Sequence, residues 1–152
     1  MNGFYEITTQ LYNELIAAGI PVVTLGDYLK VDLSRQNPLP YAHIVPQISL
    51  VKENTVEYTF AIIAMDLVDF NKDSLRDEEN TFNGTDNLQD VLNDIHNRLN
   101  LVVYQFRYGD QWDNLIHGDN DYTLDPFFKR FENLYAGWEL NVTFEYPNTD
   151  IC

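Results

Sequence analysis

An uninterrupted alternation of apolar and polar residues near the end of the chain limits the folds that this sequence can adopt. Every second side chain in this stretch is apolar: Trp138, Leu140, Val142, Phe144 and Tyr146. A period of two is typical of a strand with one buried face, and Pro147 ends it because proline has no N–H for a ladder. The chain therefore needs a sheet with one face covered by other elements.

Two stretches repeat with the period of an α-helix. The first is an N-terminal stripe of Phe4, Ile7, Leu11 and Leu15. The second and longer stripe comprises Leu88, Val91, Leu92, Ile95, Leu99, Val102, Val103 and Phe106. Gly19 predicts the end of the first helix, and the second begins at a variant capping box of Asp86 and Gln89 and ends near Gly109. We expect each helix to bury one face.

Between the helices the sequence predicts a hairpin of two long strands, 42–51 and 56–68, joined by a polar turn at Lys52–Thr55. Pro46 marks the first strand as an edge strand or a bulged strand. The second strand alternates up to Ile62 and then becomes apolar on both faces. The tip of the hairpin is therefore expected to be polar and its base buried. Two short strands, 22–25 and 28–33, and a proline-containing loop at 36–40 precede it.

Two long polar segments, 70–86 and 110–126, carry no period and are expected to be loops. The stretch 127–134 fits a strand or a loop equally. Residues 1–152 are expected to form a single domain of the α+β class, with a mostly antiparallel sheet and two helices packed on one face. The opposite face is expected to be polar, either exposed to water or used in assembly.

Charge excludes several classes of function. The chain has 9 Lys and Arg against 24 Asp and Glu, a formal net charge of −15 and a pI near 4.2. Such a surface repels phosphate backbones, so binding of nucleic acid by charge neutralisation is not expected as the main activity. No apolar run approaches the roughly 20 residues of a membrane span. The N-terminus is acidic and amphipathic, so we expect no secretory signal and no membrane partner.

The sequence contains no catalytic motif for nucleophilic, phosphate-binding or zinc chemistry. Its only cysteine is the terminal Cys152, and His43, His96 and His117 lie in three different elements without metal-ligand spacing. We expect His96 to be a partly buried helix residue. No cofactor is expected, and the chain is not expected to be an enzyme.

Carboxylates and aromatic residues leave some alternatives open. An enzyme would need a metal site among Asp66, Asp69, Asp119 and Asp121, although the 119–121 segment lacks the glycine and the final acid of a calcium loop. Aromatic residues gather in the second half of the chain and fit either a core or a protein interface: Tyr104, Phe106, Tyr108, Trp112, Tyr122, Phe127, Phe128 and Phe131. The net charge also fits an acidic DNA mimic that inhibits a DNA-binding enzyme.

In its order of elements the chain resembles the tail-terminator and neck connector ring proteins of tailed bacteriophages. The matching segments are Phe4–Ala18, Val22–Leu25, Ala42–Asp66, Leu88–Arg107 and Trp138–Tyr146. The closing GWELNVTFEYPNTDIC is similar to the C-terminus of connector-ring proteins of crAss-like and related phages. The long acidic loops differ from the shorter terminators of long tails, which favours a connector below the portal.

The resemblance implies a structural virion protein, made in the host cytoplasm, that forms a sixfold or twelvefold homo-oligomeric ring in the phage neck. Its partners would be copies of itself, the portal and other neck or tail proteins, with genomic DNA passing through the lumen without tight binding. We expect contacts between subunits at the hairpin tip and in the polar segments, with these candidates: Lys52, Glu53, Asn54, Thr55, Asp77, Glu78, Glu79 and Trp112.

Overall fold

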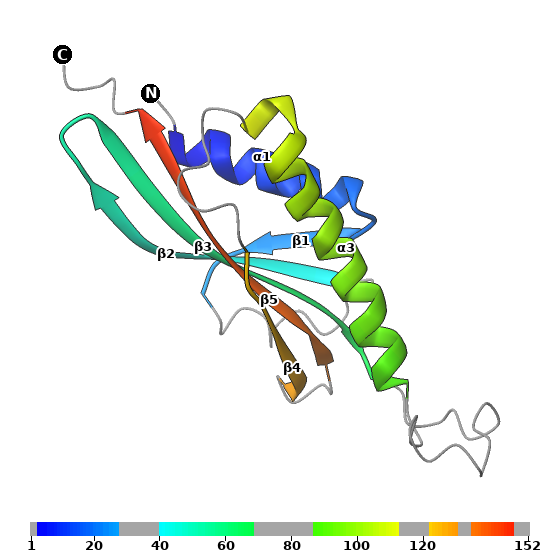
Figure 1. Ribbon diagram of the computed structural model, residues 1–152. Helices are drawn as coiled ribbons and strands as arrows, with labels where there is room; N and C mark the ends of the chain where they lie inside the picture. Colours follow the sequence, from blue (N-terminus) through cyan, green and yellow to red (C-terminus); the bar gives the residue numbers. More distant parts are fainter. Residues whose placement is uncertain (1–2, 28–39, 69–86, 113–121, 131–134, 148–152) are drawn as a thin grey trace, which may run out of the picture.

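The computed structural model describes residues 3–27, 40–68, 87–112, 122–130 and 135–147. They form a five-stranded sheet of order β1-β2-β3-β5-β4 with helices on one face (Figure 1). The elements are α1 (Gly3–Ala17), β1 (Val22–Leu25), β2 (Tyr41–Val51), β3 (Thr55–Leu67), α3 (Leu88–Tyr108), the 3₁₀ helix η2 (Asp110–Trp112), β4 (Leu124–Arg130) and β5 (Tyr135–Pro147). Only β1 runs parallel to its neighbour, so the expected α+β fold with a mostly antiparallel sheet is confirmed.

Helix α1 ends as its sequence predicts. Ile7, Leu11 and Leu15 are fully buried, which accounts for the apolar stripe. Gly19 has a φ of 90°, a conformation that L side chains rarely adopt. The N–H of Ile20 donates to the carbonyl of Leu15 at 3.1 Å, and the N–H of Gly19 donates to that of Ile16 at 3.0 Å. These bonds form a Schellman motif and satisfy two carbonyls at the helix end.

Arg98 of α3 fastens this helix end to the second helix. Its Nη1 donates to the carbonyl oxygens of Gly19 at 2.7 Å and Ala18 at 3.3 Å, and its Nε donates to Asp94 Oδ2 at 2.8 Å. A guanidinium next to the carbonyl end of α1 also opposes the negative end of the helix dipole. One side chain thereby fixes the relative position of the two helices.

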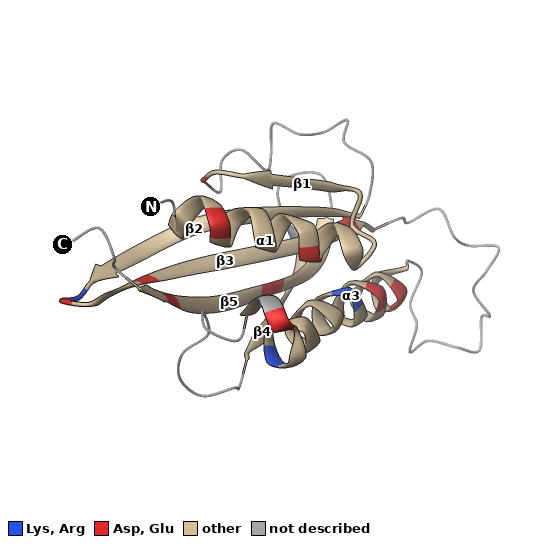
Figure 2. Ribbon diagram, turned by 90° about the horizontal axis from the view of Figure 1, so that it is seen from above, with Lys and Arg blue, Asp and Glu red and all other residues tan. Residues whose placement is uncertain are grey.

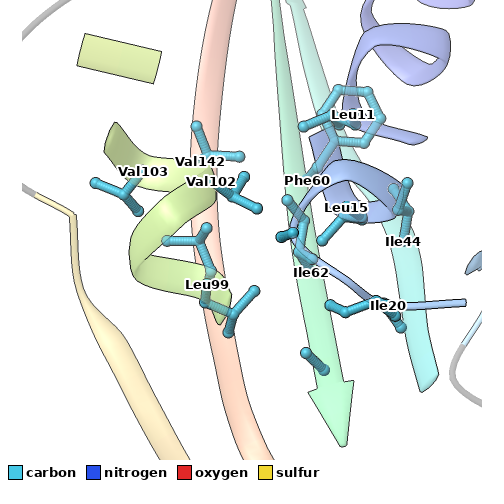
Figure 3. Packing of buried hydrophobic residues seen from close by; sticks show 14 of the residues in the cluster. Leu11, Leu15, Ile20, Ile44, Phe60, Ile62, Leu99, Val102, Val103 and Val142 are labelled. Atoms are coloured by element: carbon cyan, nitrogen blue, oxygen red, sulfur yellow. The ribbon is translucent and has the colours of Figure 1, made fainter. Parts of the chain in front are cut away.

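The main core lies between the helices and the sheet, as Figure 3 shows. Helix α3 packs against β3 and β5, and its buried residues are Val91, Ile95, Leu99, Val102, Val103 and Phe106. They meet Phe60 and Ile62 of β3 and Val142 and Phe144 of β5 in a single cluster with α1. Burial of each large side chain contributes roughly 1.5–3 kcal/mol, so this cluster is the chief source of stability.

A second apolar cluster lies on the helix-free face of the sheet. Its members come from the buried base of the hairpin and from the neighbouring strands: Tyr41, Val45, Ala61, Ile63, Met65, Phe127 and Tyr135. The expectation that this whole face is polar is therefore wrong for the half next to the hairpin base. The expected buried base and exposed tip of the hairpin are confirmed by the burial along β2 and β3.

The expected loop at 110–126 is also wrong at both of its ends. Asp110–Trp112 form a 3₁₀ turn, and β4 begins at Leu124. Trp112 is 1% exposed because its ring stacks on Phe144 and meets the edge of Phe106, with centroids 4.8 and 4.9 Å apart. The stretch 127–134, which fitted a strand or a loop, is a strand as far as Arg130. The expected strand 28–33 and the loop 70–86 lie outside the described residues.

Replacement of Gly19 tests the helix end. A Cβ at this position would lie 2.2 Å from Nη1 of Arg98, and a non-glycine residue at positive φ costs about 1–2 kcal/mol. We therefore expect Gly19→Ala to lower the free energy of unfolding by about 1–2 kcal/mol or more in urea titrations. Gly19→Asn should cost less than alanine, since asparagine tolerates the left-handed region better. Equal stability of wild type and Gly19→Ala would contradict this account.

Candidate assembly surface

The outer half of the β2–β3 hairpin, residues 46–59, is here called the arm. In Figure 1 it extends from one end of the sheet beyond the helices, with the end of β5 beside it. The turn at its tip is closed by the N–H of Lys52, which donates to the carbonyl of Thr55 at 2.8 Å. The predicted tip residues Lys52, Glu53 and Asn54 are exposed and Thr55 is half-buried, so the hairpin contributes four polar residues to one protruding point.

The outer edge of β2 is paired over only part of its length. Strand β1 pairs with Tyr41 to Ile44, and no described strand lies along the same edge from Val45 to Val51. The register with β3 shifts between Pro46 and Ser49, so the predicted bulge at Pro46 is confirmed. Beyond Ile44 the strand therefore presents a row of backbone groups that another strand could pair with.

One face of the arm is covered by the beginning of α1. The ring of Phe4 meets the rings of Tyr58 and Phe60, with centroids 5.9 and 5.8 Å apart. The hydroxyl of Tyr146 donates to the Glu6 carboxylate, and a Cβ at Gly3 would lie 2.8 Å from the Tyr146 ring. These contacts hold the N-terminus of α1 closely against the arm and the end of β5 beside it.

The other face of the arm is open. A hollow of about 560 Å³ lies over it, lined by Pro46, Gln47, Ile48, Leu50, Glu57 and Thr59. Ile48 is 80% exposed and Leu50 is 51% exposed, although both are large and apolar. Apolar side chains beside an unpaired strand edge are typical of a surface that is covered on association.

The tip carries a charge cluster. Nζ of Lys52 lies 2.6 Å from Glu57 Oε1 and 3.7 Å from Glu145 Oε1, and Thr55 Oγ1 donates to the same Glu145 oxygen at 2.6 Å. The hydrogen bond to Glu57 raises the pKa of Lys52 above its usual 10.5, with a further contribution from the Glu145 charge. Glu57 and Glu145 are register partners, so Lys52 supplies one positive charge to two carboxylates that face each other across β3 and β5.

The remaining predicted contact residues have different outcomes. Trp112 belongs to the core, so its assignment as a contact residue is wrong. Its neighbours in the sequence are polar, and they gave no sign that this side chain is buried. Its indole Nε1 donates to Glu14 Oε1 at 3.3 Å, which satisfies the buried N–H. Asp77, Glu78 and Glu79 lie outside the described residues.

An exposed surface on α3 contains Tyr104 and Tyr108, two of the aromatic residues that fitted either a core or an interface. Leu101, Tyr104 and Tyr108 are all more than half exposed, and the rings of the two tyrosines are 4.9 Å apart. We call these three residues the α3 stripe. Their spacing of i, i+3 and i+7 places them on one side of the helix. The sequence alone did not distinguish this side from the one that buries Val102 and Val103. The aromatic residues of this region thus serve both the core, through Phe106, and the surface.

The histidines serve structural purposes where they are described. His43 is fully buried: its Nε2 lies 2.7 Å from the carbonyl oxygen of Asp27 and its Nδ1 2.7 Å from Thr24 Oγ1. A carbonyl only accepts, so Nε2 carries the proton, and Thr24 then donates to Nδ1 while it accepts from the Tyr41 hydroxyl. His96 is half-buried against the edge of Trp138, as expected. His117 lies outside the described residues.

No three His, Cys, Asp or Glu side chains come together as a metal site within the described ranges. Asp66 lies at the end of β3, where its Oδ1 accepts from the Leu67 N–H at 2.7 Å. Asp69, Asp119, Asp121 and Cys152 fall outside those ranges. No described helix has the length and apolar character needed to cross a membrane.

The described carboxylates are spread over several elements. Figure 2 shows acidic residues on α1, on the hairpin, on β5 and on α3. A mimic of DNA needs its carboxylates in rows on one face, and the described carboxylates come from these separate elements. The chain matches no protein-family model, and no curated protein matches it significantly.

Neutralisation of Lys52 tests the charge cluster. We expect Lys52→Gln to lower the melting temperature slightly at neutral pH, because two facing carboxylates lose their counter-charge, and we expect high salt to reduce the difference. Since the folded-state pKa is raised, the lysine's contribution is present below pH 10.5 and is lost as the pH rises through the folded-state value. Glu53→Gln, which removes a charge of opposite sign at the same tip, should not destabilise. Identical melting of Lys52→Gln and wild type in low salt would contradict the cluster.

Asp66 should also make the stability of the protein depend on pH, but here the charged form of the side chain is the destabilising one. Burial raises the pKa of its carboxyl above 3.8, helped by the nearby Asp94 charge. The folded state therefore holds this proton more tightly than the unfolded state, and ionisation of Asp66 costs stability as the pH rises.

We expect Asp66→Asn to stabilise the protein at pH 7, by under about 1 kcal/mol because water screens the half-exposed carboxylate. The gain should disappear as the pH falls below 3.8. The matched control is Asp90→Asn, which removes an acid from the first turn of α3, where the helix dipole favours it, and should not stabilise. Unfolding curves across pH that show a loss of stability in Asp66→Asn at pH 7 would disprove the effect.

Proposed function

We propose that this chain is a structural subunit that assembles head-to-tail into a ring, and that the ring is a head–tail connector or tail terminator in the neck of a tailed phage. The observation that carries the proposal is the arm: a protruding hairpin with exposed Ile48 and Leu50, beside an edge of β2 along which no described strand lies from Val45 to Val51. Closure of a ring covers such an edge on every copy at once.

The remaining features support a structural role. Where the chain is described, its histidines and Trp112 have structural partners, and its carboxylates form no cluster that could hold a metal. The position between portal and tail follows from the resemblance in element order and closing strand. A net charge of −15 suits a channel wall, since DNA passes a surface of its own sign without adhering.

The acidic DNA mimic is not proposed as a second function, because no described feature points to it specifically: the described carboxylates come from several elements. In the proposed ring the net charge serves passage of DNA rather than competition with it. The assembly would be made of identical subunits, sixfold or twelvefold, with the portal and other neck or tail proteins above and below it.

Hydrodynamic size and electron microscopy test the proposal. We expect sedimentation velocity of the full chain, alone or with a phage portal protein, to give a discrete oligomer, and negative-stain images to show closed annuli. A chain that remains monomeric at all concentrations and beside the portal would overturn it. Open filaments instead of annuli would overturn the closed ring.

A further inference from the structure

Among the described residues, two of the exposed apolar surfaces lie on different elements. One is the arm, with Ile48 and Leu50. The other is the α3 stripe, whose Tyr108 is 68% exposed, and it adjoins a hollow of about 330 Å³ between α1 and α3. That hollow is lined by Glu14, Ala17, Ala18, Leu101 and Gln105. Exposed apolar surface on two elements of one domain offers two halves of a contact.

The two surfaces do not face each other within one molecule. The arm extends from one end of the sheet, whereas α3 lies over β3 and β5 beside α1 (Figures 1 and 2). A contact between them therefore joins two copies. Because it uses different surfaces on the two partners, it is heterologous and can propagate until a ring closes.

Charge favours the contact of an arm with α3 over the contact of two arms. Around the arm tip the carboxylates of Glu53, Glu57 and Glu145 outnumber the single cation Lys52. Two arms side by side would bring these excess carboxylates together, which is unfavourable.

The second half of α3 has the complementary composition. From Asn97 to Tyr108 it carries no acid and two arginines, of which Arg98 is already paired with Asp94 and the end of α1 and Arg107 lies further along the helix. Arg107 is exposed beside the stripe, with its guanidinium 5.7 Å from the centroid of the Tyr122 ring. Of the described acids, Asp110 follows the helix and Glu14 accepts the Trp112 N–H at the border of this region.

We infer that the arm of one copy docks on the α3 stripe of the next, with Ile48 and Leu50 against Leu101, Tyr104 and Tyr108 and the acidic tip towards Arg107. This inference rests on the proposed ring and names the two surfaces that build it. The partner is thus a second copy of this chain, and each copy contributes its arm to one neighbour and its stripe to the other.

Two double variants test the pairing by complementation. The arm variant is Ile48→Asp with Leu50→Asp, and the stripe variant is Leu101→Asp with Tyr104→Asp. Each should weaken self-association by about tenfold or more, because apolar contacts at the centre of an interface are replaced by charge. Each variant still carries one intact surface. An equimolar mixture of the two should therefore form a one-to-one dimer and stop there.

Matched controls separate docking from folding. Gln89→Asp with Asn93→Asp places the same two charges on exposed positions at the other end of α3 and should assemble like wild type. Circular dichroism and thermal melting verify that each variant is folded. Ile48→Ser and Tyr104→Ser provide milder replacements, and the same mixing experiment on them gives the same dimer if docking is correct.

The outcomes distinguish the inference from the function on which it rests. Suppose that the wild-type chain assembles. The docking of arm on stripe is then overturned, and the ring is not, if the mixture of folded variants stays monomeric or if either variant assembles as wild type does. A wild-type chain that never assembles overturns both. Sedimentation velocity of wild type, each variant and the mixture reads out all of these results.

Discussion

The outer edge of β2 is the constraint on which the proposed biology depends. Backbone N–H and C=O groups must be paired or hydrated, and strand β1 supplies partners for this edge only as far as Ile44. Further along the same strand Ile48, Leu50 and Val51 are exposed on a projecting hairpin. Extending β1 by a few residues would have completed the edge. Instead β1 ends at Leu25, and no described strand continues along this edge beyond Ile44.

The hairpin combines two environments in one pair of strands. At its base β3 is buried on both faces, by the helices through Phe60 and Ile62 and by the second cluster through Ile63 and Met65. At its tip only the beginning of α1 covers one face. The rigid base therefore holds the arm in a fixed direction, which favours a geometrically defined contact over a flexible tether. The Arg98 contact with the end of α1 contributes to the same rigidity.

The parts of the fold that the sequence predicted are those with an uninterrupted period. The closing strand, the long helix and the hairpin follow from alternation or helical spacing, and Gly19 ends α1 because the required φ is positive. Trp112 was missed because its partners, Phe106 and Phe144, are tertiary neighbours that no local pattern reveals. Strand β4 was obscured by Pro126, which an edge strand tolerates. The candidate surface was half predicted: the tip came from turn chemistry, whereas the α3 stripe needed the helix to be oriented on the sheet.

Amide hydrogen exchange along β2 tests the central claim most directly. In the isolated chain, alternate amides from Val45 to Val51 point away from β3 and should exchange rapidly, whereas those paired with β1 and β3 should be protected. On assembly, the contact that covers the arm should slow exchange in this segment specifically. Full protection of the segment in the isolated chain would show that the edge is already complete, and rapid exchange that persists on assembly would show that no neighbour covers it. Either result would contradict the account.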